Sequence, residues 1–476
     1  MKNKKYILGF ACIIFIFAAC KTPQIFEKEI TQKPLSSFNG STDSTNAASL
    51  NWRQYFKDPN LNLLIDSALS NNQELNILNQ EIRMTSNEVM ARKGEYQPFV
   101  NLGGAMGADK VGRYTNIGAS EATTDIKPGV ETPEPLPDFK MSAVASWELD
   151  IWHKLRNAKK AAYSHYLATI EGKNFMVTNL ISEIANSYYE LISLDNQLEI
   201  VSQNIDIQTN ALNIVRAQKE AARITELAVK KFEAEVYKTR SMQFDIQQQI
   251  VIVENKINLL VGRFPQKIAR TKININDIFP DIVNVGIPSQ MLQNRPDIRQ
   301  AEKELEAAKL SVKSAKANFY PSLRISAELG LQAFNPIYLA NIPKSLISSL
   351  AGDMVGPLIN KNAIRATYYN ANATQIQAVY KYERTVLTAF IEVINQLAQI
   401  ENLKKSYDLR TKQVDALTQS IEISNTLFKY ARADYMEVLM TQRDALESKF
   451  DLVETKKQQL NAWINTYRAL GGGWNK

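Results

Sequence analysis

Residues 294–331 change their hydrophobic period abruptly at one proline, and this change constrains the fold more than any other feature of the chain. Before Pro321, small and apolar residues recur at intervals of three and four, the spacing of a coiled-coil seam. After Pro321 the period is two, with apolar residues on one face and polar or charged residues on the other. The stretch therefore predicts a helix at about 295–318 followed by a strand at about 321–332.

The chain carries this unit twice. Aligning Pro321 with Pro98 sets an offset of 223 residues, whereas aligning Arg365 with Arg156 sets an offset of 209 that persists for more than a hundred residues. The decrease means that the first copy has 14 extra residues between its proline and its arginine. We expect them in the polar, Gly/Pro-rich stretch 107–138. An internal duplication is the simplest account of these matches.

Each copy is expected to read helix, strand, loop, strand and helical hairpin. The first copy covers 51–286 and the second 287–476. The expected elements are a helix at about 72–94, strands at 98–108 and 139–149 and a hairpin at 157–262, then a helix at 295–318, strands at 321–332 and 348–359 and a hairpin at 363–470. Long stretches without proline allow helices of about 60 residues, or about 90 Å. Thr225 and Asp434 are expected to cap the returning helices.

The predicted strands carry charge on one face only. The polar-face residues are Lys140, Ser142, Glu148, Ser322, Arg324 and Glu328. A polar face opposite an apolar one is typical of barrel strands that separate a lumen from lipid. Four strands are too few to enclose a lumen, and open sheet edges in lipid cost several kcal/mol for each unpaired backbone group. We therefore expect two or more chains to close the barrel as a hollow tube.

The N-terminus predicts export and lipid attachment. Residues 1–20 combine an early cluster of lysines with a short apolar run that ends in two alanines before Cys20. This resembles a lipoprotein signal peptidase site, with Phe17 where leucine is preferred, and it predicts lipidation of Cys20. The alternative is an ordinary signal peptide or membrane anchor with a chance cysteine. Residues 21–50, rich in Ser, Thr, Asn and Gln, are expected to form a tether.

Composition argues against several other classes of function. The net charge is +7, but basic residues alternate with acidic ones along the predicted helices, so no nucleic-acid partner is expected. His153 and His165 have no cysteine nearby, which speaks against a metal site. The sequence contains no Gly-rich phosphate loop, no G-x-S-x-G motif and no catalytic cysteine arrangement. We expect neither an enzyme nor a cofactor.

Several motifs together resemble the TolC-like outer membrane factors of the lipoprotein subgroup, over nearly all of residues 50–474. They include Trp52, Phe56-Lys57-Asp58-Pro59, Leu149-Asp150, Leu260-Val261-Gly262-Arg263, Arg295-Pro296-Asp297-Ile298, Phe319-Tyr320-Pro321-Ser322, Gln442-Arg443 and Ala469-Leu470-Gly471-Gly472-Gly473-Trp474. The resemblance implies an α+β membrane protein: a homotrimer with a twelve-stranded β-barrel, four strands from each chain, continued by an α-helical coiled-coil tunnel in the periplasm.

The same resemblance implies a function and partners. Such a chain is the outer-membrane exit duct of a tripartite efflux system, a passive channel anchored to outer-membrane lipid through Cys20. It receives small molecules from a periplasmic adaptor and an inner-membrane pump, most often of the RND type. Two alternatives remain open: a duct for type I protein secretion, and a non-conducting periplasmic coiled-coil scaffold. The sequence encodes neither the cargo nor the pump.

The resemblance also implies two kinds of site at the periplasmic end. The adaptor-docking tips are Ala222, Arg223, Ile224, Thr225, Ala431, Arg432, Ala433 and Asp434. Relatives usually carry glycine in these turns, where this chain has Ala222 and Ala431, and often carry glycine at His153. The gate is expected at Met436, Glu437 and Met440, with Met440 where many relatives have aspartate. The alternative is that both methionines are ordinary seam packing.

Overall fold

The computed structural model describes residues 22–26, 28–30, 47–278, 286, 288–430 and 432–474. The expected signal peptide with Cys20, most of the expected tether at 21–50, and Ala431 lie outside the described residues. The chain divides into two compact units. The sheet unit contains Arg83–Tyr166 and Lys303–Val379 with the N-terminal residues, and the bundle unit contains Ile30–Ile82, Leu167–Glu302 and Tyr380–Lys476.

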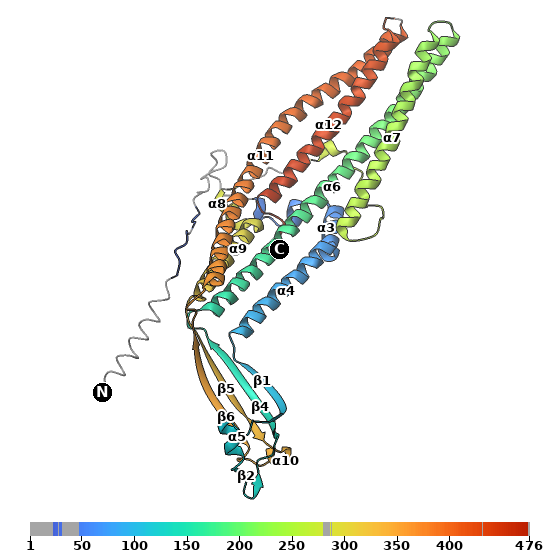
Figure 1. Ribbon diagram of the computed structural model, residues 1–476. Helices are drawn as coiled ribbons and strands as arrows, with labels where there is room; N and C mark the ends of the chain where they lie inside the picture. The colour runs from blue at the N-terminus through green and yellow to red at the C-terminus, as the bar shows by residue number, and fades with distance from the viewer. Residues whose placement is uncertain are drawn as a thin grey trace. The chain divides into compact units, whose positions relative to one another are not determined.

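A four-stranded antiparallel sheet dominates the sheet unit (Figure 1). Its strands, in the order β1-β4-β5-β6, are β1 Phe99–Asp109, β4 Leu136–Leu149, β5 Ser322–Ala333 and β6 Leu346–Val355. The last strand, expected at 348–359, begins two residues earlier and ends at Val355. Gly356 and Pro357 follow, and proline cannot donate to a strand ladder.

The two strand hairpins obey the sequence repeat. Phe99 pairs with Ser146 in the first hairpin, and Ser322 pairs with Val355 in the second. These partners differ by the two offsets found in the sequence, 223 and 209. The connection between β1 and β4 is 14 residues longer than that between β5 and β6, as predicted. The longer one contains α5 Asn116–Glu121, β2 Asp125–Lys127 and β3 Val130–Glu131, and the shorter one α10 Pro336–Leu339.

Helix ends complete the sheet unit. Four helices contribute residues to both units: α4 Gln73–Glu95, α6 Lys154–Glu220, α9 Pro296–Ala317 and α11 Asn362–Lys429. Where α9 and α11 meet, Phe319 and Tyr368 are buried edge to face, with ring centroids 5.6 Å apart. Ile25, from the N-terminal segment, packs against this small core. Ile25 is thereby held next to the point where β5 begins.

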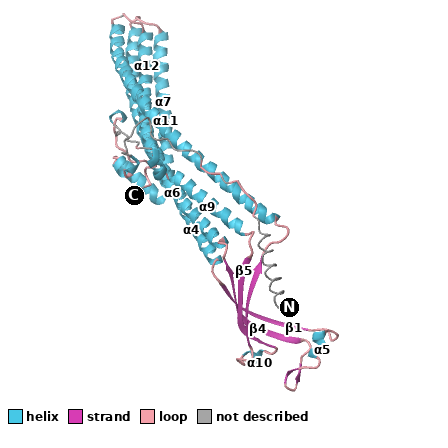
Figure 2. Ribbon diagram, turned by 90° about the vertical axis from the view of Figure 1, so that its left-hand side faces the viewer, coloured by secondary structure: helices cyan, strands magenta, loops and turns pink. Residues whose placement is uncertain are grey.

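The bundle unit is built from two long helical hairpins (Figure 2). α7 Glu226–Val261 returns after α6, and α12 Tyr435–Ala469 returns after α11. Its main core includes Ile184 and Tyr188 of α6, Ile257 of α7 and Ile464 of α12. The shorter elements are η1 Ala47–Ser49, α2 Trp52–Tyr55, α3 Pro59–Asn71, η2 Ile275–Asp277 and α8 Pro288–Asn294.

Helices α3 and α8 were not anticipated by the sequence analysis. They end at Asn71 and Asn294, which differ by the repeat offset of 223, so each copy has a short helix before its expected first helix. For α3 the sequence does contain a start signal. The Asp58 carboxylate accepts hydrogen bonds from the backbone N–H groups of Asn60 and Leu61, and Pro59 occupies the first helical position.

Both helical hairpins end in the same way. Gly262 after α7 and Gly471 after α12 have φ values of 78° and 87°, in the left-handed region. The side chain of Asn72 donates to the Leu260 carbonyl at 2.8 Å, and that of Arg295 donates to the Ala469 carbonyl at 2.9 Å. Each pair of equivalent residues is separated by the repeat offsets. The duplication therefore extends to individual hydrogen bonds.

Candidate functional site

The polar residues predicted for the strands share one face of the sheet. Lys140 of β4 and Glu328 of β5 form an ion pair at 2.6 Å. Glu148 lies directly opposite Arg324, and Ser142 opposite Gly330. Since side chains alternate between the faces of a strand, these pairs place Lys140, Ser142, Glu148, Ser322, Arg324 and Glu328 on one side. We call this side the polar face.

The opposite side is apolar and open to solvent in the single chain. Its exposed large residues are Val100, Leu102, Met106, Met141, Leu329, Leu346, Leu350 and Met354. They come from all four strands and belong to the rows of residues that alternate with the polar face. A continuous exposed apolar surface of this kind marks contact with a partner or with a membrane. We call this side the apolar face.

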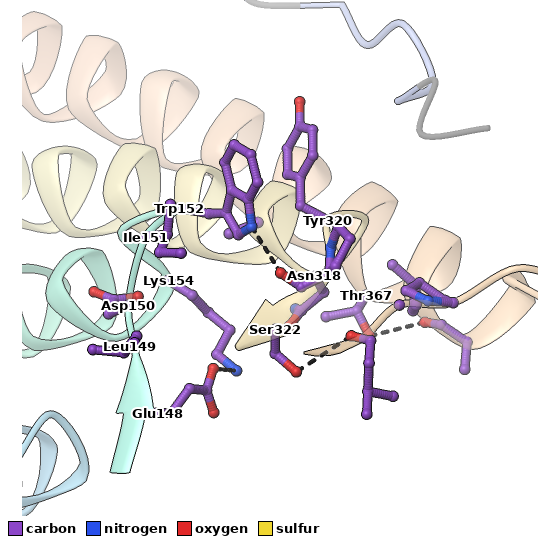
Figure 3. A pocket seen from close by; sticks show the side chains of 17 residues that line it. Glu148, Leu149, Asp150, Ile151, Trp152, Lys154, Asn318, Tyr320, Ser322 and Thr367 are labelled. Atoms are coloured by element: carbon purple, nitrogen blue, oxygen red, sulfur yellow. Dashed lines mark hydrogen bonds and ion pairs between the residues drawn. The ribbon is translucent and has the colours of Figure 1, made fainter. Parts of the chain in front are cut away.

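A cavity of about 500 Å³ lies where the strands join the helices (Figure 3). Trp152 stacks on Tyr320 with a centroid distance of 4.8 Å, and its Nε1 donates to the Pro321 carbonyl at 2.7 Å. On the cavity wall, Lys154 pairs with Glu148 at 2.5 Å. These contacts connect the end of β4 to the start of β5 across the repeat boundary.

The turn between β4 and α6 is held by a buried carboxylate. Asp150, whose side chain is 1% exposed, accepts from the backbone N–H groups of Leu155 and Arg156, both at 2.9 Å, and from the guanidinium of Arg156. His153 adopts a φ of 59° in this turn. A left-handed conformation favours glycine, so His153 occupies a position of the turn where glycine would be less strained.

The first helical tip closes on a left-handed residue. Ala222 has a φ of 54°, and the Arg223 N–H donates to the Gln218 carbonyl at 2.9 Å, a Schellman-type closure. In the second tip the Arg432 N–H donates to the Leu427 carbonyl at 2.9 Å, the equivalent bond. Arg223, Thr225, Arg432 and Asp434 are exposed in these turns.

The two predicted helix caps differ from each other. The Asp434 carboxylate accepts from the Tyr435 N–H at 2.6 Å. Thr225 occupies the predicted N-cap position of α7, but its side chain makes no capping hydrogen bond. An ion pair between Lys219 and Glu226 joins the two helices beside it instead, and a hydrogen bond from Lys219 lowers the pKa of the Glu226 carboxyl.

The tip turn gives a first testable prediction. We expect Ala222→Gly to stabilise the first tip, because glycine removes a left-handed cost of about 1–2 kcal/mol. Hydrogen exchange of the Arg223 amide should slow by about tenfold. The matched control is Ala217→Gly, an exposed site inside α6, which should speed exchange nearby because glycine lowers helix stability. Equal effects of the two changes would contradict the prediction.

The three predicted gate residues are divided between two environments. Glu437 and Met440 line a cavity of about 390 Å³ between α11 and α12. Met436 does not line this cavity, and its sulfur lies 3.3 Å from Nζ of Lys231 on α7. Met440 is 48% exposed and therefore available to a partner or a lumen, whereas Met436 is half-buried.

One acidic residue of this cavity was not predicted from the sequence. Asp444 lies one helical turn beyond Met440 and lines the same space as Glu437. Its spacing of seven residues from Glu437 was a usable signal, because residues seven apart share a helix face. Asp444 also pairs with Arg443 at 2.9 Å.

Among the described residues, no helix combines the length and the hydropathy that crossing a membrane requires. In the same part of the chain, no group of three or more His, Cys, Asp or Glu side chains is placed to hold a metal ion. His165 instead contacts Glu304 through Nδ1 at 2.8 Å.

The profile of the "Outer membrane efflux protein" family matches residues 64–263 and 287–472. The chain is 24% identical to the cation efflux system protein CusC of Escherichia coli over 469 residues, 98% of each chain. It is 25% identical to the pyoverdine export outer membrane protein OpmQ of Pseudomonas aeruginosa, covering 89% of this chain and 87% of that one. The open-state structure of the Neisseria gonorrhoeae MtrE outer membrane channel matches with a TM-score of 0.82 at 21% identity, covering 95% and 98% of the two chains.

Proposed function

Since this chain belongs to the outer membrane efflux protein family, we propose that it is the passive outer-membrane exit duct of a tripartite efflux system. The observation that carries the proposal is the sheet with one ion-paired polar face, one exposed apolar face and two unpaired edges. A water-filled lumen requires a polar face, and contact with lipid requires an apolar face. The unpaired edges require further chains to close the barrel. A non-conducting scaffold needs none of these features, and we assign the chain no catalytic role.

Three copies close the barrel. Four strands from each chain make twelve, which exceeds the eight of the smallest membrane barrels. In this arrangement the polar face becomes the lumen wall and the apolar face contacts lipid. The long helical hairpins then pack side by side as a tunnel that extends into the periplasm.

The N-terminal segment supports attachment of the duct to the outer membrane. Ile25 packs against the core around Phe319, at the start of the first strand of the second copy. Cys20 precedes Ile25 by five residues, a reach of at most about 18 Å in an extended chain. An acyl group on Cys20 would thus lie close to the strands that meet lipid.

The helical tips form the docking surface for a periplasmic adaptor, which receives cargo from an inner-membrane pump of the RND type. Two turns at equivalent positions of the repeat support this, residues 222–225 and residues 432–434. In the sequence, Ala431 directly precedes the second turn. The cargo is small molecules such as drugs and toxic compounds. The relatives are named for different cargo, cations in one case and pyoverdine in the other, so a selective step upstream of the duct is part of this proposal.

The function is tested by conductance. Purified full-length protein in planar bilayers should form stable channels, and deletion of the gene should sensitise cells to several unrelated toxic compounds. Pull-down with the duct should recover an adaptor of a drug pump. A folded oligomer without conductance would favour the non-conducting scaffold. If deletion of the gene abolished secretion of a polypeptide but left resistance unchanged, type I protein secretion would be favoured.

Glu437 provides a prediction for the gate. In a trimer its carboxylates form a ring at the periplasmic end of the tunnel, where rings of acidic side chains select cations. We expect Glu437→Gln to reduce the cation preference of the open channel, measured as a reversal potential in a salt gradient. The control is Glu401→Gln, whose side chain is exposed on α11 and paired with Lys405 at 2.8 Å. An unchanged reversal potential in both variants would remove Glu437 from the gate.

A further inference from the structure

The outer strands of the sheet leave a defined set of backbone groups unpaired. Beyond the last residues of the strands, the Gln332 N–H donates to the Ser345 carbonyl at 2.8 Å, in register with the β5–β6 ladder. In an antiparallel ladder, bonded and non-bonded pairs alternate. Odd-numbered residues of β6 therefore bond to β5, and its even-numbered residues direct their N–H and C=O groups outward.

The same alternation can be followed through the sheet to β1. Even-numbered residues of β5 bond to β6, so its odd-numbered residues bond to β4. In β4, the odd-numbered residues therefore bond to β5, and the even-numbered residues bond to β1. The pairing of Phe99 with Ser146 then assigns the odd residues of β1 to β4. The even residues of β1 are left outward, as on β6.

The internal repeat supplies a template for what covers these edges. Within one chain, β4 of the first copy pairs with β5 of the second copy, with Ala145 opposite Ala327. The equivalents of these two residues, at offsets of 209 and 223, are Met354 of β6 and Gly104 of β1. We infer that β6 of one protomer pairs antiparallel with β1 of a second copy of this chain, with Met354 opposite Gly104. This inference rests on the proposed barrel and specifies its closing register.

Side-chain sizes along the two edges agree with this register. Large residues oppose small ones on the apolar face at four successive positions: Leu350 with Ala108, Gly352 with Met106, Met354 with Gly104, and Gly356 with Leu102. In the single chain Met106 is 83% exposed and Leu350 is 79% exposed. Each therefore has room over a small residue across the interface.

Slipped registers lose this fit. A shift of one residue would turn the apolar face of one strand onto the polar face of the other. A shift of two in one direction places Met354 opposite Leu102 and Gly352 opposite Gly104; the other direction places Met354 opposite Met106. Both crowd large side chains together and leave glycines facing each other. The register from the repeat avoids both problems and pairs outward-directed even residues with one another.

Pairing with β1 of a neighbour also extends β6 beyond its end in the single chain. Its repeat equivalent, β4, continues to Leu149, which corresponds to Leu358. In the single chain β6 ends at Val355, leaving Leu358 69% and Ile359 90% exposed. In the assembled barrel, residues 356–359 extend the strand, with Leu358 opposite Val100 and Ile359 opposite Phe99 of the neighbour. Pro357 is odd-numbered, so its missing N–H removes nothing from the new ladder.

Engineered disulfides test the register. Asp353 and Ala105 oppose each other at a non-hydrogen-bonded position on the polar face, where Cα atoms lie about 4.5 Å apart and a disulfide can form. Within one chain these residues lie three strands apart, about 14 Å, so only an intermolecular bond is possible. We expect the Ala105→Cys/Asp353→Cys variant of the full-length protein to give reducible multimers on non-reducing gels.

The controls are variants matched for a register shifted by two. Asp353→Cys combined with Gly103→Cys or with Gly107→Cys places the two cysteines on a diagonal with Cα atoms about 7–8 Å apart, which is too far for an unstrained disulfide. They should yield less cross-linked product by on the order of tenfold. The wild-type chain and the single-cysteine variants measure background. A second pair, Gly103→Cys with Val355→Cys, tests the same register if the first variant does not assemble.

The inferred register would be overturned if either shifted pair gave the dominant cross-linked product. It would also be overturned if neither in-register pair cross-linked in a protein that still conducts. Conductance is measured separately on each variant after reduction. Cross-linking in register without conductance would support the register and contradict the proposed function as an exit duct. Conductance without in-register cross-linking would support the exit duct and contradict the register.

Discussion

Replacing Arg295 with leucine is expected to lower the free energy of unfolding by about 3–5 kcal/mol, because it removes the buried half of an ion pair and leaves the half-buried carboxylate of Asp297 without its partner. The guanidinium, 5% exposed, bonds both carboxylate oxygens of Asp297 and reaches Glu392 at 2.8 Å. It also donates to the Ala469 carbonyl at the end of α12. Burial lowers the pKa of Arg295, but the two carboxylates more than compensate and raise it overall, so the charge is retained.

Guanidinium unfolding in detergent, followed by tryptophan fluorescence, measures the effect of Arg295→Leu. Arg295→Lys should lie between wild type and the leucine variant, because lysine keeps the charge but loses the bidentate geometry. The matched control is Arg53→Leu, which removes an exposed ion pair with Asp66 and should change stability by about 1 kcal/mol or less. Similar losses in both leucine variants would show that burial of the network does not matter.

Alanine at Gly471 should destabilise the bundle unit by about 2–5 kcal/mol, from left-handed strain and a backbone clash together. A Cβ there would lie 2.7 Å from the Asn294 carbonyl carbon and oxygen. The repeat makes the same prediction for Gly262→Ala, whose Cβ would lie 2.5 Å from the Asn71 oxygen. In both copies the end of a long hairpin contacts the end of a short helix.

The melting temperature of purified protein measures this second effect, with Gly94→Ala as the control. A Cβ at Gly94 meets no atom within 4 Å, and alanine is the better helix former in α4, so this variant should match or exceed wild type. A markedly unequal response of Gly262→Ala and Gly471→Ala would contradict the equivalence of the two hairpin ends.

Local patterns predicted most of the fold. The change of period at Pro321 places the end of α9 and the start of β5 to within one or two residues. The offsets of 223 and 209 recur in the strand registers and in the hydrogen bonds of Asn72 and Arg295. Such features are readable because they depend on residues that are close in sequence, or on two stretches that repeat the same pattern.

Predictions about individual side chains were less complete. Thr225 occupies its predicted position without the capping bond, and Met436 contacts Lys231 instead of lining the cavity of Glu437 and Met440. The Met436 contact involves a neighbouring helix, which a single helical pattern does not contain. The helix α8 was missed because seven residues are too few for a hydrophobic period to be recognised.

The sequence by itself determined the period change at Pro321, the duplication, and the polar and apolar rows of the strands, since these follow from backbone periodicity and residue type. Only the tertiary structure decided which strands lie side by side, that Ala222 adopts a left-handed conformation, and that β6 stops at Val355 in the single chain. The strand order depends on hydrogen bonds between segments far apart in sequence. The conformation of Ala222 depends on the Arg223–Gln218 bond that closes its turn, and β6 ends at Val355, which pairs with Ser322, the first residue of β5.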